Sequence, residues 1–306
     1  TDIKENKEYW EDLTSQGLRF PIIEKPVPIY YKLDKTLNQL FDDTVSAIQH
    51  PHEGLRYFRY QAIKFLIEPY RSQYDDAASI SERLAAIMKT LLIKRLDSSF
   101  HSFMESLKRY RDASRAMMLM FENDRVHIAP SLHVSEFILE GNEDELIEKM
   151  NHLRESDPTA QTYKADDFET GFIEGLQHDH EIIQSLYDRW KKWQLKNKDP
   201  KFIEFVERLE TDLLTDKKGK QRKLVIFSEY KDTTNYLLGE LINAGFEKIL
   251  AVDSSNQREV AEAVRRNFDA RLDIKEQRND YDILITTEVL AEGVNLHRAY
   301  TLINYD

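Results

Sequence analysis

The sequence predicts an α/β protein in which a helical N-terminal region is followed by a partial parallel sheet with flanking helices. Two patterns lead to this class. Apolar residues recur every three or four positions over residues 34–210, which is the period of amphipathic helices. After residue 222, short runs rich in β-branched residues alternate with helical stretches, which is typical of a doubly wound sheet. A charged run at 215–223 separates the two patterns.

Composition favours a helix-rich globular protein with room for two domains. Of the 306 residues, 41% are apolar and 32% are charged, and only 9 are glycine. No run approaches the roughly 18 apolar residues of a membrane span, and the N-terminus lacks a signal-peptide pattern. We therefore expect a cytoplasmic protein without a membrane partner. The lack of cysteine excludes disulfides and thiol chemistry.

The formal net charge of −12 argues against a surface that binds nucleic acid everywhere, because phosphate contacts need clustered lysine and arginine. A local basic groove is compatible with this charge.

Residues 1–33 form a polar, proline-rich lead-in. Pro21, Pro26 and Pro28 forbid a helix there. We expect an extended segment that lies at a sheet edge or begins a strand.

Residues 34–216 are predicted to be mainly helical. Asp34 is a candidate N-cap for the first helix, and a second helix is expected over 55–70. A capping box at 79–82 begins a long apolar stripe that extends, with one interruption, to about residue 121. Further helices are expected over 166–196 and after Asp199-Pro200, a favourable N-cap and first residue.

Residues 217–306 are predicted to form four parallel strands joined by helices. The strands are expected at 224–227, 249–252, 283–285 and 301–303, and the last two should be buried on both faces. Gly245 is expected to close the first of the connecting helices.

Polar side chains follow two of these strands. Ser228 and Lys231 come after the first strand, and Thr286 and Thr287 end the third. The carboxyl ends of parallel strands share one edge, where ligands bind in open α/β sheets. We therefore expect these hydroxyls and this lysine to lie together with exposed polar atoms, as phosphate contacts require.

The loop that leads to the fourth strand has the chemistry to hold a phosphate or a ribose. Gly293 permits a tight turn, and Asn295 offers an amide donor and acceptor.

These segments resemble known helicase motifs. Thr286-Thr287, a short helix, Glu292-Gly293-Val294-Asn295-Leu296 and the next strand resemble motif V of the superfamily 2 helicases and translocases, closest to the Swi/Snf branch. Lys223–Thr233 resembles motif IV. The chain departs from the Swi/Snf pattern at Thr287 and Glu288, where that branch often has an aspartate or a small residue.

The resemblance implies a truncated RecA-like C-terminal lobe at 217–306 and an inter-lobe helical region at 34–216. It implies nucleic-acid contacts at Ser228, Lys231, Thr286 and Thr287, and nucleotide contacts at Glu292, Gly293 and Asn295. It also implies ATP and Mg²⁺ in the intact enzyme, a missing N-terminal RecA-like lobe as partner, and double-stranded DNA as the track, with RNA left open.

Sequences needed for phosphoryl transfer are incomplete in this chain. It has no Gly-x-x-x-x-Gly-Lys-Ser/Thr segment, no Asp-Glu-x-His box and no arginine-rich motif VI. Phosphoryl transfer needs a phosphate cradle, a magnesium ligand and usually an arginine. We therefore predict a fragment with no catalytic residue of its own, no bound ATP or Mg²⁺ and no ATP hydrolysis.

Two other functions stay open. One is a non-enzymatic module whose helices bind a protein partner beside a small α/β scaffold, and the other is a free-standing nucleotide-binding protein. A helix face carrying two arginines and three serines is either a track for a phosphate backbone or a solvated surface: Arg95, Ser98, Ser102, Ser106 and Arg109. His178-Asp179-His180-Glu181 brings at most two ligands together and is interpreted as an exposed polar turn without metal.

Overall fold

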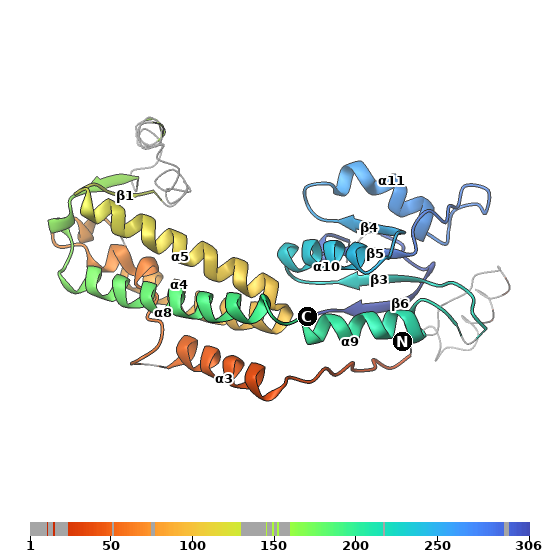
Figure 1. Cartoon of the computed structure of the whole chain (residues 1–306). Coiled ribbons are helices and arrows are strands. Elements are labelled where there is room, and N and C mark those ends of the chain that lie inside the picture. The colour runs from red at the N-terminus through yellow and green to blue at the C-terminus, as the bar shows by residue number, and fades with distance from the viewer. Residues whose placement is uncertain are drawn as a thin grey trace.

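The computed structural model describes residues 11, 15, 24–50, 52–74, 77–129, 145, 149, 152, 160–216, 218–290 and 294–306, with the side chains of 77–81 excepted. The chain has a helical region and an α/β unit, which lie end to end (Figure 1). The hydroxyl side chains of the expected capping box at 79–82 lie outside the described residues, as do Glu292 and Gly293.

Four helices build the core of the helical region: α3 (Lys35–Gln49), α4 (Ala77–Ser98), α5 (Phe100–Glu122) and α8 (Gly171–Gln194). Asp34 caps α3 as predicted, because its carboxylate accepts from the backbone N–H of Leu37 at 2.8 Å. The helices share one apolar cluster, in which Trp190 is fully buried. Its indole N–H donates to Thr44 Oγ1 at 2.9 Å, so the ring is buried without an unpaired donor.

The predicted apolar stripe is split into α4 and α5 by one interruption, as expected. Ser99 lies between them and caps α5 by accepting from Ser102 N at 3.0 Å. The start of the stripe is not buried, since Leu84 is 41% and Ile87 is 52% exposed. The stripe is therefore only partly covered in the N-terminal half of α4.

The helix expected over 55–70 is wrong. The segment instead forms 3₁₀ turns at Phe58–Phe65 and Arg71–Gln73. The reason lies on α8, where the buried Asp179 carboxylate accepts from Arg56 N and Phe58 N, both at 2.7 Å. Burial raises the pKa of Asp179, while the two backbone hydrogen bonds act to lower it. The expected exposure of the polar turn around Asp179 is wrong too, because Asp179 is buried within α8, in the helix predicted over 166–196.

A second cluster fills the far end of the helical region. There β1 (Val126–Ile128) pairs antiparallel with β2 (Gln161–Tyr163), a pair that the sequence did not predict. Phenylalanine rings from the 3₁₀ turn, α5 and α8 pack beside it. Gly175 lies against the Phe58 ring, and a Cβ at this position would overlap it.

The α/β unit contains the predicted four-stranded parallel sheet. Its strands are β3 (Lys223–Phe227), β4 (Ile249–Val252), β5 (Ile283–Thr286) and β6 (Ala299–Asn304), in the order β4-β5-β3-β6. Leu224 and Ile226 pack with residues of α9 (Pro200–Arg208) and α10 (Lys231–Asn243). Val225 packs on the other face with α11 (Gln257–Phe268). Helices on both faces confirm the predicted α/β class.

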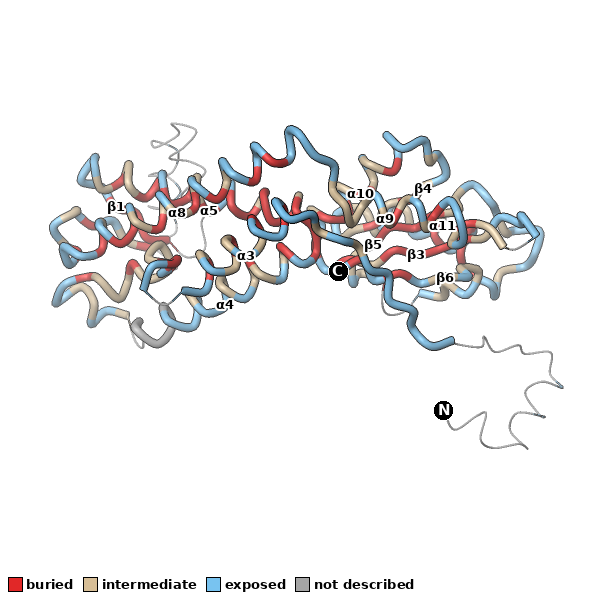
Figure 2. The backbone as a smooth tube through the Cα atoms, turned by 60° about the horizontal axis from the view of Figure 1, so that its bottom comes forward, coloured by how far each residue is buried: buried red, intermediate tan, exposed pale blue. Residues whose placement is uncertain are grey.

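Two expectations for the sheet are wrong. β6 is an edge strand, and Tyr300 and Leu302 on it are 67% and 69% exposed, so it is not buried on both faces. Residues 24–33 of the lead-in form no strand and run along the surface as a largely exposed segment (Figure 2). Prolines without N–H groups do not contribute to a ladder of backbone hydrogen bonds.

The core of the sheet extends back beyond the charged run at 215–223. Phe205, Leu209 and Leu214 belong to the cluster under β3 and β5. Thr215 and Gln221 form a bridge around a tight turn. The domain boundary at 217 remains a prediction, and α9 packs with the α/β unit. Over the ranges that the structure describes, no helix is both long and apolar enough to cross a membrane.

Candidate functional site

The carboxyl edge of the sheet faces the helical region. The C-terminus, which follows β6, lies beside the junction of α4 and α5 (Figure 1). Ser228 N donates to Thr286 O at 3.1 Å, so the ends of β3 and β5 adjoin as predicted. The carboxyl ends of β3, β5 and β6 therefore meet at the junction with the helical region.

The side chains of Ser228 and Thr286 are buried, which contradicts their expected exposure. Ser228 Oγ donates to Asp306 Oδ1 at 2.9 Å and accepts from Tyr230 N at 3.3 Å. Thr286 Oγ1 donates to the carbonyl oxygen of Thr287 at 3.0 Å, and Thr287 itself is half-buried. Both buried hydroxyls therefore bond within the protein, because the α4–α5 junction and Asp306 pack against this edge.

Lys231 is the exposed cation among the predicted contacts. Its ammonium lies 3.0 Å from Asp253 Oδ2, beyond the end of β4, and 3.2 Å from Ser255 Oγ. A hydrogen bond from Ser255, with further help from Lys231, lowers the pKa of Asp253 to about 2. Because half of the Lys231 side chain is open to solvent, it is available to an anion at this edge.

Of the predicted nucleotide contacts, the structure describes Asn295, which bonds within its own loop. Asn295 Oδ1 accepts from His297 N at 3.1 Å, and its amide nitrogen lies 3.2 Å from the His297 ring. Glu292 and Gly293 lie outside the described residues. Over the described ranges, no group of three or more histidines and carboxylates could hold a metal ion.

A chain of hydroxyls crosses from the helical region to the sheet edge. Ser98 Oγ donates to Asp306 Oδ1 at 2.5 Å, so its 2.8 Å contact with Thr233 Oγ1 must be a bond that it accepts. Thr233 then accepts from Ser99 Oγ at 3.1 Å. Each hydroxyl has one proton, and the Asp306 carboxylate fixes the direction of the whole chain. Ser98, Ser99 and Thr233 are buried.

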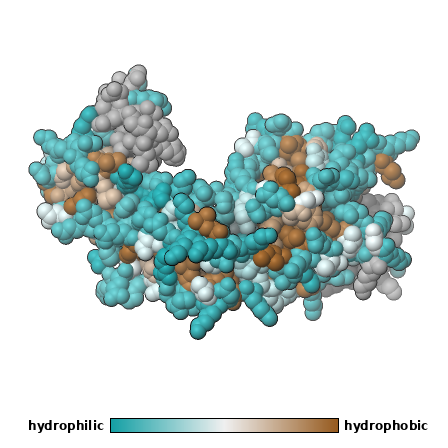
Figure 3. Space-filling view, in the orientation of Figure 1, coloured by the Kyte–Doolittle hydropathy of each residue, from teal (hydrophilic) through white to brown (hydrophobic). Residues whose placement is uncertain are grey.

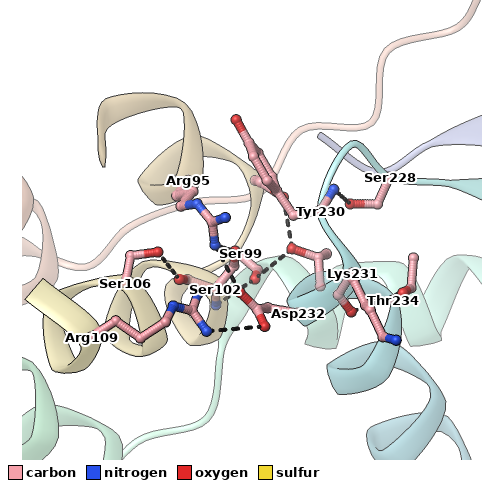
Figure 4. Close-up of polar contacts among 12 residues, drawn as sticks. Arg95, Ser99, Ser102, Ser106, Arg109, Ser228, Tyr230, Lys231, Asp232 and Thr234 are labelled. Carbon is pink, nitrogen blue, oxygen red and sulfur yellow. Dashed lines mark hydrogen bonds and ion pairs between the residues drawn. The ribbon is translucent and has the colours of Figure 1, made fainter. Parts of the chain in front are cut away.

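Two arginines from the helical region bind one carboxylate of the α/β unit (Figure 4). Arg95 Nη1 lies 2.8 Å and Arg109 Nη2 lies 2.5 Å from Asp232 Oδ2. Burial acts to raise the pKa of Asp232, but hydrogen bonds from Arg109 and Arg95 outweigh it and lower that pKa. Arg95 also lies 4.6 Å over the Tyr230 ring. In this structure the arginine–serine helix face is not a free track, because Arg95, Ser98 and Arg109 contact α10.

Two lysines add further contacts across the junction. Lys94 of α4 pairs with Glu229 after β3, at 3.3 Å. Lys201 of α9 donates to the carbonyl oxygens of Asp97 and Ser98 at 2.9 and 2.7 Å, where α4 ends. Burial lowers the pKa of Lys201, although nearby carboxylates act in the other direction.

The partners of the helix face could not be predicted, because they lie more than a hundred positions away in the sequence. No local pattern around Asp232, Thr233 or Asp306 indicates these contacts. The observable signal was the serine–arginine face itself, since buried hydroxyls need partners.

A broad hollow separates the two parts on the face shown in Figure 3. In the same orientation, α5 and α10 border it (Figure 1). These helices carry Arg109 and Asp232, so the ion pair joins the two sides of the hollow.

Comparison with known proteins finds a family match over the last third of the chain. Residues 203–306 match the family model of the helicase conserved C-terminal domain. The chain is similar to the helicase domain of Hef from Pyrococcus furiosus, with 15% identity and a TM-score of 0.39 over 88% of this chain and 46% of that one. It is also similar to the C-terminal part of the Fun30 ATPase domain, with 14% identity and a TM-score of 0.34 over 90% and 73%.

The chain therefore spans about half the length of the Hef helicase domain that it matches. Comparison with curated proteins gave no match.

Proposed function

We propose that this chain is part of an ATP-dependent superfamily 2 helicase or translocase of the Swi/Snf-like branch, whose track is double-stranded DNA. Residues 203–306, which match the helicase conserved C-terminal domain, would then contribute a RecA-like lobe. ATP and Mg²⁺ would be bound with the help of a second lobe of the same enzyme. The helical region would connect the two lobes.

The observation that carries this proposal is the carboxyl edge of a helicase-type sheet with an exposed lysine. The ends of β3 and β5 adjoin there, and Lys231 lies at the start of α10 with half of its side chain open to solvent. Ligands of open α/β sheets bind at this edge, and phosphate contacts come from lysine and from backbone N–H groups. Ser228 and Thr286, whose side chains are buried, would act by positioning the backbone of these loops.

Binding of a short, fluorescently labelled DNA duplex tests the proposal. Fluorescence anisotropy over a range of salt concentrations should detect salt-dependent binding by the wild-type chain. Lys231→Ala should weaken it and reduce the slope of log K against log salt by about 0.9, the effect of one lost phosphate contact. The matched control is Lys248→Ala, which removes an exposed lysine paired with Asp282 at the opposite edge of the sheet.

Equal loss in the two lysine variants would mean that the carboxyl edge has no special role. If the wild-type chain binds no duplex at all, the rival function of a protein-interaction module is favoured. An RNA duplex of the same sequence decides between DNA and RNA as the track.

A further inference from the structure

The contact of Arg95 and Arg109 with Asp232 has the chemistry of a phosphate site that a carboxylate fills. Guanidinium groups bind carboxylate and phosphate oxygens with the same planar donor geometry. Here two guanidiniums meet on one oxygen of Asp232. A nucleic-acid phosphate would offer the same partners an equivalent oxygen.

The Asp232 carboxylate lies in the first turn of α10 but accepts its hydrogen bonds from the helical region. All three of its recorded hydrogen bonds come from Arg95 and Arg109, and none comes from a backbone N–H in the first turn of α10. The carboxylate therefore binds side chains of the helical region, and it does not cap α10 by accepting from a backbone N–H.

The arginine pair is also reachable from solvent. The side chain of Arg109 is 54% exposed, and those of Arg95 and Asp232 are each 25% exposed. The ion pair of the exposed Arg109 contributes little to stability, so another anion can compete for this arginine first, while the Arg95–Asp232 pair is more buried. Arg95 would keep its place without Asp232, because it also contacts Ser102 Oγ at 3.4 Å and the face of Tyr230.

We propose that Asp232 is an internal substitute for a backbone phosphate, and that Arg95 and Arg109 exchange it for a phosphate of a bound duplex. The inference rests on the proposed function and adds to it a second contact surface, on the helical region. In the structure Asp232 occupies both arginines, so the contact is autoinhibitory toward a phosphate. Exchange would release the helical region from Asp232, while the buried hydroxyl chain through Ser98 and Thr233 would remain as the pivot.

The test is Asp232→Asn in the whole chain, measured with the labelled DNA duplex between about 50 and 200 mM salt. Because wild type and Asp232→Asn reach the same complex, the variant should bind the duplex about two- to fivefold more tightly, since no ion pair has to be given up, with the slope of log K against log salt unchanged. Adding Arg109→Gln to this variant should remove one phosphate contact and lower that slope by about 0.9. Circular dichroism checks that the variants fold.

The matched control is Asp43→Asn, which makes the same charge change at another exposed arginine–aspartate pair. Asp43 Oδ2 lies 2.5 Å from Arg189 Nη2 on the contact between α3 and α8, away from the junction. This control should leave both the affinity for the duplex and the slope unchanged.

The outcomes separate the two proposals. If the wild-type chain binds the duplex and Asp232→Asn behaves as Asp43→Asn does, the exchange is wrong and the proposed function stands. If neither the wild-type chain nor Asp232→Asn binds, both are wrong. If Asp232→Asn does not fold, Arg109→Gln in the wild-type background decides, since it should lower the slope by about 0.9 and an unchanged slope would overturn the exchange.

Discussion

Removing the Thr233 hydroxyl should destabilise the junction between the helical region and the sheet. Thr233→Val keeps the shape and leaves Ser99 Oγ, which donates to Thr233 at 3.1 Å, without its acceptor. It also removes the bond that Ser98 Oγ accepts at 2.8 Å. A buried donor without a partner costs about 1–3 kcal/mol, and we expect Thr233→Val to lower the free energy of unfolding by that amount.

The neighbouring residue supplies the control. Thr234 is buried as well, but its hydroxyl donates only to the carbonyl of Lys231 in its own helix, at 2.9 Å. Thr234→Val should therefore cost about 1 kcal/mol or less, with the same change in helix propensity. Urea unfolding followed by circular dichroism measures both. Losses that agree within about 0.5 kcal/mol would refute the directed hydroxyl chain across the junction.

Three further outcomes are expected. Gly175→Ala should cost about 1–3 kcal/mol in urea unfolding, because the added Cβ would overlap the packed Phe58 ring, whereas Gly171→Ala, with no atom within 4 Å, should cost nothing; equal effects would contradict the close approach. The pKa of Asp253 falls from 3.8 to about 2 on folding, so its stabilising contribution is present above pH 4 and is lost as the pH falls toward 2. The difference in unfolding free energy between wild type and Asp253→Asn should therefore shrink over that window, and a constant difference would contradict it. The chain alone should release no phosphate from ATP with or without duplex DNA, and turnover above buffer would contradict the incomplete phosphoryl-transfer machinery.

The local periodicity of apolar residues was sufficient to predict the strands of the sheet and most of the helices. The boundaries of β3, β4 and β5 follow from short β-branched runs between turn residues, and Gly245 closes α10 with a φ of 93°. The shared edge of β3 and β5 followed from parallel pairing alone.

The failures come from contacts between distant segments. The turn at Phe58–Phe65 depends on Asp179, and β1 is stabilised by pairing with β2 across more than thirty positions. Each strand of that pair has three residues, too few to show a period of two. The burial of Ser228 depends on the α4–α5 junction packing against the sheet edge, which no local pattern encodes.

Hydrogen–deuterium exchange with and without a DNA duplex tests most directly whether the carboxyl edge binds nucleic acid. Peptides covering residues 228–234 and 286–290 should exchange more slowly when the duplex is bound. A peptide covering 245–248, at the opposite edge of the sheet, should not change. Duplex binding with protection at 245–248, or with none at 228–234 and 286–290, would contradict the account.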